Sequence, residues 1–349
     1  GLSGGAALPI FDAIVHSNID LILVRHEQGA SHMADGYARS TGKPGVVLVT
    51  SGPGATNTLT GIMTAHMDSV PMIILTGQQI RSMLGKDAFQ EADIYDISMP
   101  VVKHSYLVKE AEDIPRVVRE AFYITNTGRP GPVLIDLPKD VTQGPFEGDL
   151  YPEMDLPGYK PNGDELDKEL VYPIAEALSK SKKPVILAGH GVLVSGAHGE
   201  LRTLAEKLKI PVTTTLLGKG SIPETHALSL GMLGMHGTAY ANKAMVECDL
   251  VMSVGSRYDD RIIGQAPQFC AAATRIHIDI DRSEFGRMIK CHHYCHGDAK
   301  SVLTELVKHV GELNTREWLS HLDGYKKKYP LKYQKGGGLK MQHILDILN

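Results

Sequence analysis

The chain has 349 residues, which is more than one ordinary domain and predicts two or three. Hydrophobic residues make up 42% and charged residues 22%, as in globular proteins with buried cores. Lys+Arg total 36 against 40 Asp+Glu, so a broad basic face for nucleic acid or an anionic membrane is excluded. The sequence shows no apolar run near the ~20 residues of a membrane span and no signal-peptide pattern. Four cysteines do not make a disulfide framework, and we expect a cytoplasmic protein.

Short apolar runs alternate with glycine-rich turns and amphipathic helices in the first part of the chain. Strands are predicted at 21–24, 46–49, 71–75 and 133–135, and a helix capped by Asp113 at 114–122. Continuously apolar strands between helices predict a mostly parallel sheet covered on both faces. The segment 1–5 is typical of a strand-to-helix turn without its strand. We therefore expect a first domain, 1–144, that lacks its first helix and strand.

The second part of the chain repeats this pattern after a proline-containing segment. Residues 145–167 predict a linker. Strands at 185–188, 250–254 and 276–280 and a helix near 201–208 then predict a second α/β domain, 168–309. A polar stretch at 310–339 predicts a second linker, and 340–349 the start of a further domain. The fold class is two consecutive parallel-sheet α/β domains, the second Rossmann-like.

The apolar run 21–24 is followed by Arg25-His26-Glu27, which predicts Glu27 at the end of a strand, where open α/β sheets place ligands. Alone, a surface carboxylate paired with Arg25 is the simpler interpretation. The surrounding motifs change this: GGA at 4–6, SGPGATN at 51–57, DAFQE at 87–91, KHSY at 103–106, RPGPV at 129–133 and LGMLGMHGT at 230–238. In this order, along the whole chain, the sequence resembles thiamin-diphosphate enzymes and, among them, the catalytic chains of acetohydroxyacid synthases.

The resemblance implies that Glu27 hydrogen-bonds the aminopyrimidine of thiamin and promotes removal of the thiazolium C2 proton. Gln90, Lys139 and Arg261 are implied as the other catalytic residues, with Phe89 and Met235 contacting the second keto acid. From spacing alone, Lys139 remains open as a solvated lysine, and Arg261 as half of an exposed ion pair with Asp259 or Asp260. The residues implied beside thiamin are Gly4, Gly5, Gly52, Pro53, Gly54 and Asn57.

The second domain has a Gly189-His190-Gly191 turn after a strand, which alone is a weak nucleotide signal because the third glycine is missing. The resemblance implies a largely structural FAD. Its implied contacts are Gly189, Gly191, Thr215, Leu216, Gly234, His236, Gly255, Arg257, Asp279, Ile280, Gly297 and Asp298. The cysteine- and histidine-rich stretch 291–296 has no second ligand pair nearby, so no metal site is predicted there.

Related enzymes hold the diphosphate through Mg²⁺ with a Gly-Asp-Gly motif, and the sequence contains none. We therefore expect a fragment that is inactive alone, with Mg²⁺ held by an absent domain. The intact chain is expected to condense pyruvate, after decarboxylation, with pyruvate or 2-ketobutyrate in branched-chain amino-acid synthesis. We expect a homodimer or higher homo-oligomer, with a separate regulatory subunit as a further candidate partner. The alternatives are a flavin-dependent pyruvate oxidase and a non-catalytic FAD-binding remnant.

Overall fold

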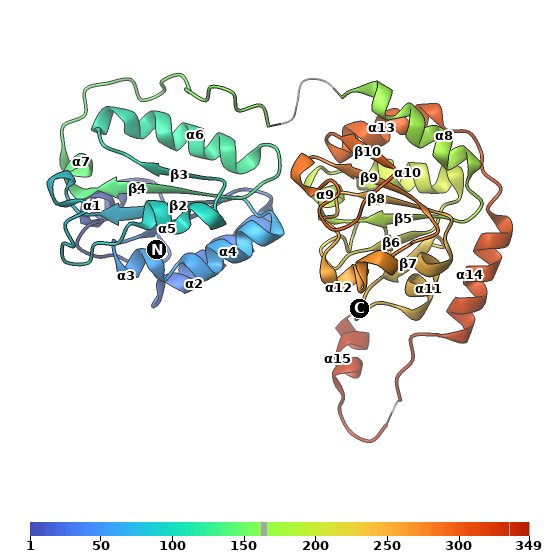
Figure 1. Ribbon diagram of the computed structural model, residues 1–349. Helices are drawn as coiled ribbons and strands as arrows, with labels where there is room; N and C mark the ends of the chain where they lie inside the picture. The colour runs from blue at the N-terminus through green and yellow to red at the C-terminus, as the bar shows by residue number, and fades with distance from the viewer. Residues whose placement is uncertain (162–165, 335, 349) are drawn as a thin grey trace. The chain divides into compact units, whose positions relative to one another are not determined.

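The computed structural model describes residues 1–161, 166–334 and 336–348. The chain divides into two compact units, Gly1–Asn162 and Gly163–Asn349, each built on its own parallel sheet (Figure 1). Two consecutive parallel-sheet α/β domains were predicted, and this fold class is confirmed.

The sheet of the first unit has four strands in the order β1-β2-β4-β3, all parallel. They are β1 (Gly45–Val49), β2 (Met72–Gln78), β3 (His104–Leu107) and β4 (Pro132–Pro138). Both faces are covered, as continuous apolar strands require. Ile74 and Leu134 pack with α2 and α4, whereas Ile73 and Val133 pack with α6. The helices are α1 (Leu8–Val15), α2 (Glu27–Thr41), α3 (Pro53–Thr56), α4 (Leu59–Asp68), α5 (Ile94–Ser98), α6 (Ile114–Asn126) and α7 (Lys139–Gln143).

The strand predicted at 21–24 is wrong, because this segment has no strand structure. Its backbone meets the start of the chain through Gly1 N donating to Ile22 O at 2.8 Å and Val24 N donating to Gly1 O at 3.1 Å. Two such bonds do not make a ladder, and Ile22 and Leu23 stay 63% and 69% exposed. Glu27 therefore stands not at a strand end but as the first residue of α2.

Two helix starts differ in their capping. His26 caps α2, because its Nδ1 accepts from Gln28 N at 3.1 Å. Asp113 precedes α6 as predicted, but its carboxylate accepts from Arg116 Nη2 at 2.7 Å and makes no side-chain cap.

The sheet of the second unit has six parallel strands in the order β10-β9-β8-β5-β6-β7. They are β5 (Pro184–Ala188), β6 (Val212–Thr214), β7 (Ser229–Met232), β8 (Leu250–Val254), β9 (Thr274–Asp279) and β10 (His293–His296). The chain moves from β5 outward to β7 and returns to β8 on the other side of β5. The strand order thus reverses between β5 and β8, where doubly wound folds open a crevice. The helices are α8 (Tyr172–Lys180), α9 (His190–Val194), α10 (His198–Leu208), α11 (Ala239–Glu247), α12 (Asp260–Ile263) and α13 (Ala299–His309).

The segment 316–328, predicted as part of a linker, instead forms α14 (Arg316–Lys328). Trp318 and Leu322, four residues apart on one helix face, are buried in the second unit's core. The indole Nε1 of Trp318 donates to Pro184 O at 3.1 Å. The segment therefore packs on the second unit through one apolar helix face, which also includes Leu319 and Tyr325. The last helix is α15 (Met341–Leu348).

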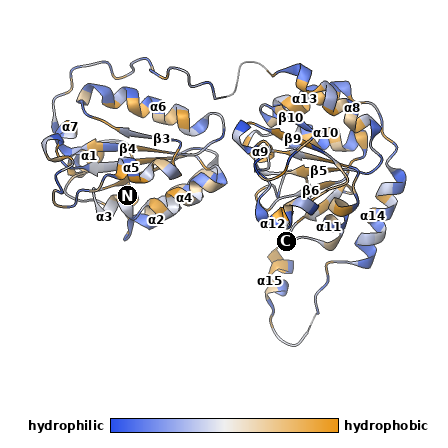
Figure 2. Cartoon of the chain, viewed as in Figure 1, coloured by the Kyte–Doolittle hydropathy of each residue, from blue (hydrophilic) through white to orange (hydrophobic). Residues whose placement is uncertain are grey.

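Helices such as α6 carry both hydrophilic and hydrophobic residues along their length (Figure 2). Within the described ranges, no helix combines the length and the apolar character that crossing a bilayer requires.

Candidate functional site

Glu27 lies half-buried at the start of α2, and its carboxylate is held by Asn57 at the end of α3. Asn57 Nδ2 donates to Glu27 Oε2 at 3.0 Å. The other oxygen lies beside Gly54, since a Cβ built on this glycine would be 3.3 Å from Glu27 Oε1. The partner recorded for Glu27 is thus Asn57 and not Arg25. The structure brings together three residues that the sequence placed at one site.

The turn after β1 and the loop before α5 meet at Gly52 and Gln90. Gly52 has φ +56°, and a Cβ there would lie 2.4 Å from Gln90 O, so only glycine fits on both counts. Gln90 itself has φ +55°, uncommon for a residue with a side chain. Gly4 packs equally closely on Thr50, whereas Gly5 has open space around its Cα. Four predicted residues, Gly4, Gly52, Gly54 and Gln90, therefore adjoin the turn that faces Glu27.

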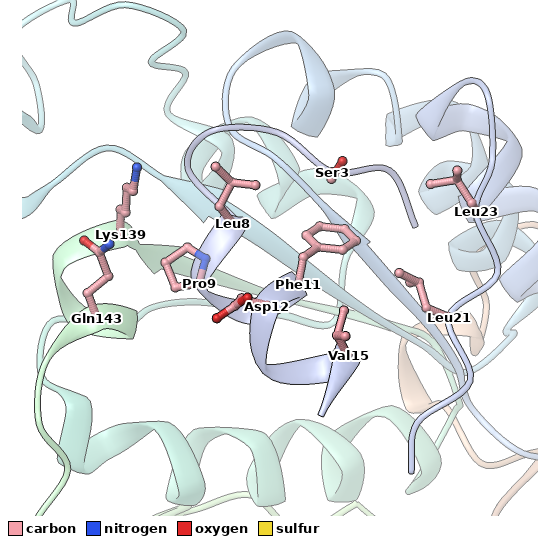
Figure 3. A pocket seen from close by; sticks show the side chains of 10 residues that line it. All are labelled: Ser3, Leu8, Pro9, Phe11, Asp12, Val15, Leu21, Leu23, Lys139 and Gln143. Atoms are coloured by element: carbon pink, nitrogen blue, oxygen red, sulfur yellow. The ribbon is translucent and has the colours of Figure 1, made fainter. Parts of the chain in front are cut away.

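Lys139 and Phe89 are placed differently. Lys139 begins α7 and lines an open pocket of about 840 Å³ between α1 and α7 (Figure 3). The wall of this pocket combines apolar side chains such as Leu8 with polar ones such as Asp12, and neither Glu27 nor Gln90 lines it. Phe89 is 82% exposed. The role of Lys139 at the Glu27 site stays a prediction.

A buried carboxylate that the sequence analysis missed lies on β4, which is separated from β1 by β2. Asp136 on β4 is 1% exposed and accepts from Thr76 Oγ1 at 2.7 Å and Gln78 Nε2 at 2.9 Å. Burial raises the pKa of Asp136 to about 7, although both hydrogen bonds oppose the rise. The signal in the sequence was a single aspartate inside the apolar run 133–137.

In the second unit, the residues implied for a nucleotide follow the carboxyl ends of the parallel strands. Gly189 and Gly191 follow β5, and Gly255 follows β8, at the point where the strand order reverses. A Cβ on Gly189 would lie 2.1 Å from Gly255 O, and one on Gly191 would lie 2.7 Å from Gly255 Cα. These glycines are therefore required by the close crossing of two loops, whatever binds above them.

The polar side chains along this edge have local partners. Arg257 Nη2 pairs with Asp259 Oδ2 at 2.7 Å. Asp298 caps α13 by accepting from Ser301 N at 3.0 Å. Asp279 Oδ1 accepts from Asp281 N at 2.9 Å. The positions are those predicted, but each contact shown is explained by the loop itself.

Met235 and Arg261 lie on adjacent loops of the second unit. Met235 N donates to Arg261 O at 3.1 Å, and a Cβ on Gly234 would lie 2.6 Å from the same oxygen. The side chain of Arg261 is 70% exposed, and its Nε lies 3.7 Å from Asp260 Oδ2. The structure thus joins these predicted residues and also contains the exposed ion pair that was the alternative interpretation.

Comparison with known proteins matches both units to parts of one enzyme family. Residues 1–97 match the thiamine pyrophosphate enzyme, N-terminal TPP binding domain, and residues 171–306 match the thiamine pyrophosphate enzyme, central domain. The acetolactate synthase of Mycobacterium leprae is 46% identical over 357 aligned residues, covering 100% of this chain and 57% of that protein.

Further relatives are as similar. The probable acetolactate synthase large subunit of Methanocaldococcus jannaschii is 48% identical, covering 94% of this chain and 56% of that protein. The large subunit of Haemophilus influenzae is 46% identical, covering 100% of this chain and 62% of that protein. The chain thus spans less than two thirds of the length of these relatives. It belongs to the thiamine pyrophosphate enzyme family, in which it is similar along its whole length to acetolactate synthase large subunits.

Proposed function

We propose that this chain supplies the thiamin-activating carboxylate and the central domain of an acetolactate synthase. The complete protein condenses pyruvate, after decarboxylation, with a second pyruvate or with 2-ketobutyrate. The names of its relatives support this activity. The observation that carries it in the structure is the carboxylate of Glu27, oriented by Asn57 at 3.0 Å beside Gly54.

The arrangement around Glu27 suits a proton-sharing role at a flat ring. Bound thiamin diphosphate supplies the electron sink for decarboxylation and carbon–carbon bond formation. Asn57 fixes one carboxylate oxygen, which leaves Oε1 on the side of Gly54 to hold a proton at a ring nitrogen. Gly52 and Gly54 carry no side chain that would fill this space. The residues present therefore fit the aminopyrimidine ring.

The proposal also includes FAD, the remaining thiamin contacts, the partners and the second keto acid. The reversal of strand order between β5 and β8 supports FAD above Gly189, Gly191 and Gly255. Gly4, Gly5 and Pro53 beside thiamin, Mg²⁺ bound outside this chain, a homodimer and a regulatory subunit remain proposals from the resemblance. So does the handling of the second keto acid by Phe89, Gln90, Lys139, Met235 and Arg261. We place the protein in the cytoplasm, with its cysteines as free thiols.

The test is Glu27→Gln in the complete gene product, assayed for acetolactate. The amide retains the shape but cannot exchange a proton, so we expect a loss on the order of 10²–10⁴ in rate, the usual contribution of a positioned acid–base group. The exposed Glu147→Gln is the matched control and should leave the rate unchanged. Near-normal turnover of Glu27→Gln would refute the role. Peroxide formation in place of acetolactate would show a flavin-dependent pyruvate oxidase.

A further inference from the structure

Gln78, the last residue of β2, connects three parts of the first unit through one buried amide. Its side chain is 3% exposed. Nε2 donates to Asp136 Oδ2 at 2.9 Å and to Ala92 O at 2.8 Å. Oε1 accepts from Gln79 N at 2.8 Å. Both donors and the acceptor of the amide are therefore satisfied by the protein itself.

Asp136 accepts one hydrogen of this amide, whose orientation is fixed by its backbone partners. It lies directly across from Thr76 in the β2–β4 pairing, and its Oδ1 accepts from Thr76 Oγ1 at 2.7 Å. Gln79 N can only donate and Ala92 O can only accept, so Oε1 of Gln78 faces Gln79 N, and Nε2 faces Ala92 O and Asp136 Oδ2. With that orientation, the second hydrogen of Nε2 is directed to Ala92 O in the loop before α5.

The same loop is held at further points. Gln79 Nε2 donates to Phe89 O at 2.6 Å. The carboxylate of Glu91 accepts from Gly85 N at 2.5 Å and from Ala88 N at 2.8 Å, which closes the loop on itself. On the other side, Gln90 O lies against Gly52 of the turn that faces Glu27. The positions of Phe89 and Gln90 relative to Glu27 are thus set by β2 on one side and by the turn after β1 on the other.

We propose that Gln78 is a positioning residue that, anchored by Asp136, holds the 85–92 loop so that Phe89 and Gln90 favour the second keto acid at the Glu27 site. This inference rests on the proposed function for its kinetic consequence, but the contact itself is independent of it. Gln78 acts through the loop and touches no reacting atom.

Gln78→Glu tests the positioning with an isosteric side chain. The substitution replaces the amide N–H donors with a carboxylate oxygen that faces Ala92 O, so the hydrogen bond from Gln78 to the loop is lost. Gln79→Glu breaks only the bond to Phe89 O and should have a smaller effect in the same direction. Gln268→Glu makes the same chemical change at an exposed position of the second unit and is the matched control.

Hydrogen exchange of the 84–94 segment reads the contact directly in this chain. We expect exchange about tenfold faster in Gln78→Glu, the size of one lost buried hydrogen bond, and about threefold faster in Gln79→Glu. Gln268→Glu should match the unsubstituted chain. If Gln78→Glu does not fold, Gln79→Glu decides alone. Unchanged exchange in either folded loop variant overturns the proposal.

Kinetics of the complete gene product then separate positioning from loss of structure. In Gln78→Glu the KM of the second keto acid should rise about tenfold, while pyruvate decarboxylation stays within about twofold. An equal fall of both steps would show a structural role only and would overturn the proposal. If the unsubstituted protein forms no acetolactate, the proposed function fails, whereas the exchange experiment still decides whether Gln78 holds the loop.

Discussion

Replacing Asp136 with asparagine should remove much of the pH dependence of the first unit's stability. The folded protein binds a proton at Asp136 more tightly than the unfolded chain does, because the pKa rises from 3.8 to about 7 on burial. Asp136 therefore makes its full contribution to the free energy of unfolding below pH 3.8, and this contribution is lost as the pH rises to 7. Asparagine resembles the neutral form, because it can accept from Gln78 and donate to Thr76 Oγ1.

The magnitude follows from the two pKa values. Each pH unit between them costs about 1.4 kcal/mol of unfolding free energy. From pH 5 to pH 7, Asp136 should therefore destabilise the first unit by about 2 kcal/mol, less than two full pH units would give because the carboxyl is half ionised at the upper end. Asp93 faces Asp136 from the start of α5 and contributes to the raised pKa through charge repulsion.

Native-state hydrogen exchange of the β2 and β4 amides, corrected for intrinsic rates, measures this opening free energy without assuming that the two units unfold together. The Asp136→Asn variant should lack this fall of about 2 kcal/mol in opening free energy between pH 5 and pH 7. Asp93→Asn, the control, should keep most of the slope but shift its upper limit to lower pH. Parallel pH profiles for Asp136→Asn and the unsubstituted chain would refute the raised pKa.

Two further substitutions test packing. Gly52→Ala should lower the free energy of unfolding by at least about 2 kcal/mol, because alanine would have to adopt a left-handed backbone and its Cβ would lie 2.4 Å from Gln90 O. The control, Gly36→Ala in α2, has no neighbour within 4 Å and should raise the free energy of unfolding by about 0.5–1 kcal/mol. Thermal unfolding measures both changes. Trp318→Ala should destabilise the second unit by about 3–5 kcal/mol in urea unfolding followed by circular dichroism, with the exposed Leu331→Ala as control; equal midpoints would show that α14 is a linker after all.

The sequence predicted those elements whose burial is carried by continuous apolar runs. The strands near 46–49, 133–135, 185–188 and 250–254 were found because a strand covered on both faces needs no polar residue. The run 21–24 has the same composition but lacks partner strands, so pattern alone failed there. Strand β10 was not predicted because its sequence, with His293 and Tyr294 before the buried Cys295, contains no continuous apolar run.

At the candidate site, resemblance and residue type identified Glu27, Asn57 and Gln90, which the structure gathers around one turn. The buried hydrogen bonds that position these residues could not be predicted from the sequence. Gln78 and Asp136 are 58 residues apart, and their hydrogen bond exists only because β2 and β4 pair in one register. A polar residue in an apolar strand signals that a partner is needed, but sequence spacing does not say which.

The crossing of the loops after β5 and β8 bears on how flavin dependence is judged in related proteins. Gly189 and Gly191 lie directly against the backbone of Gly255, so a relative without a flavin would still need all three glycines for these two loops to cross. The presence of these glycines in a relative therefore shows that the two loops cross, and does not show that a flavin binds. Whether a given relative carries the coloured cofactor must be decided from its absorbance spectrum, not from its glycine pattern.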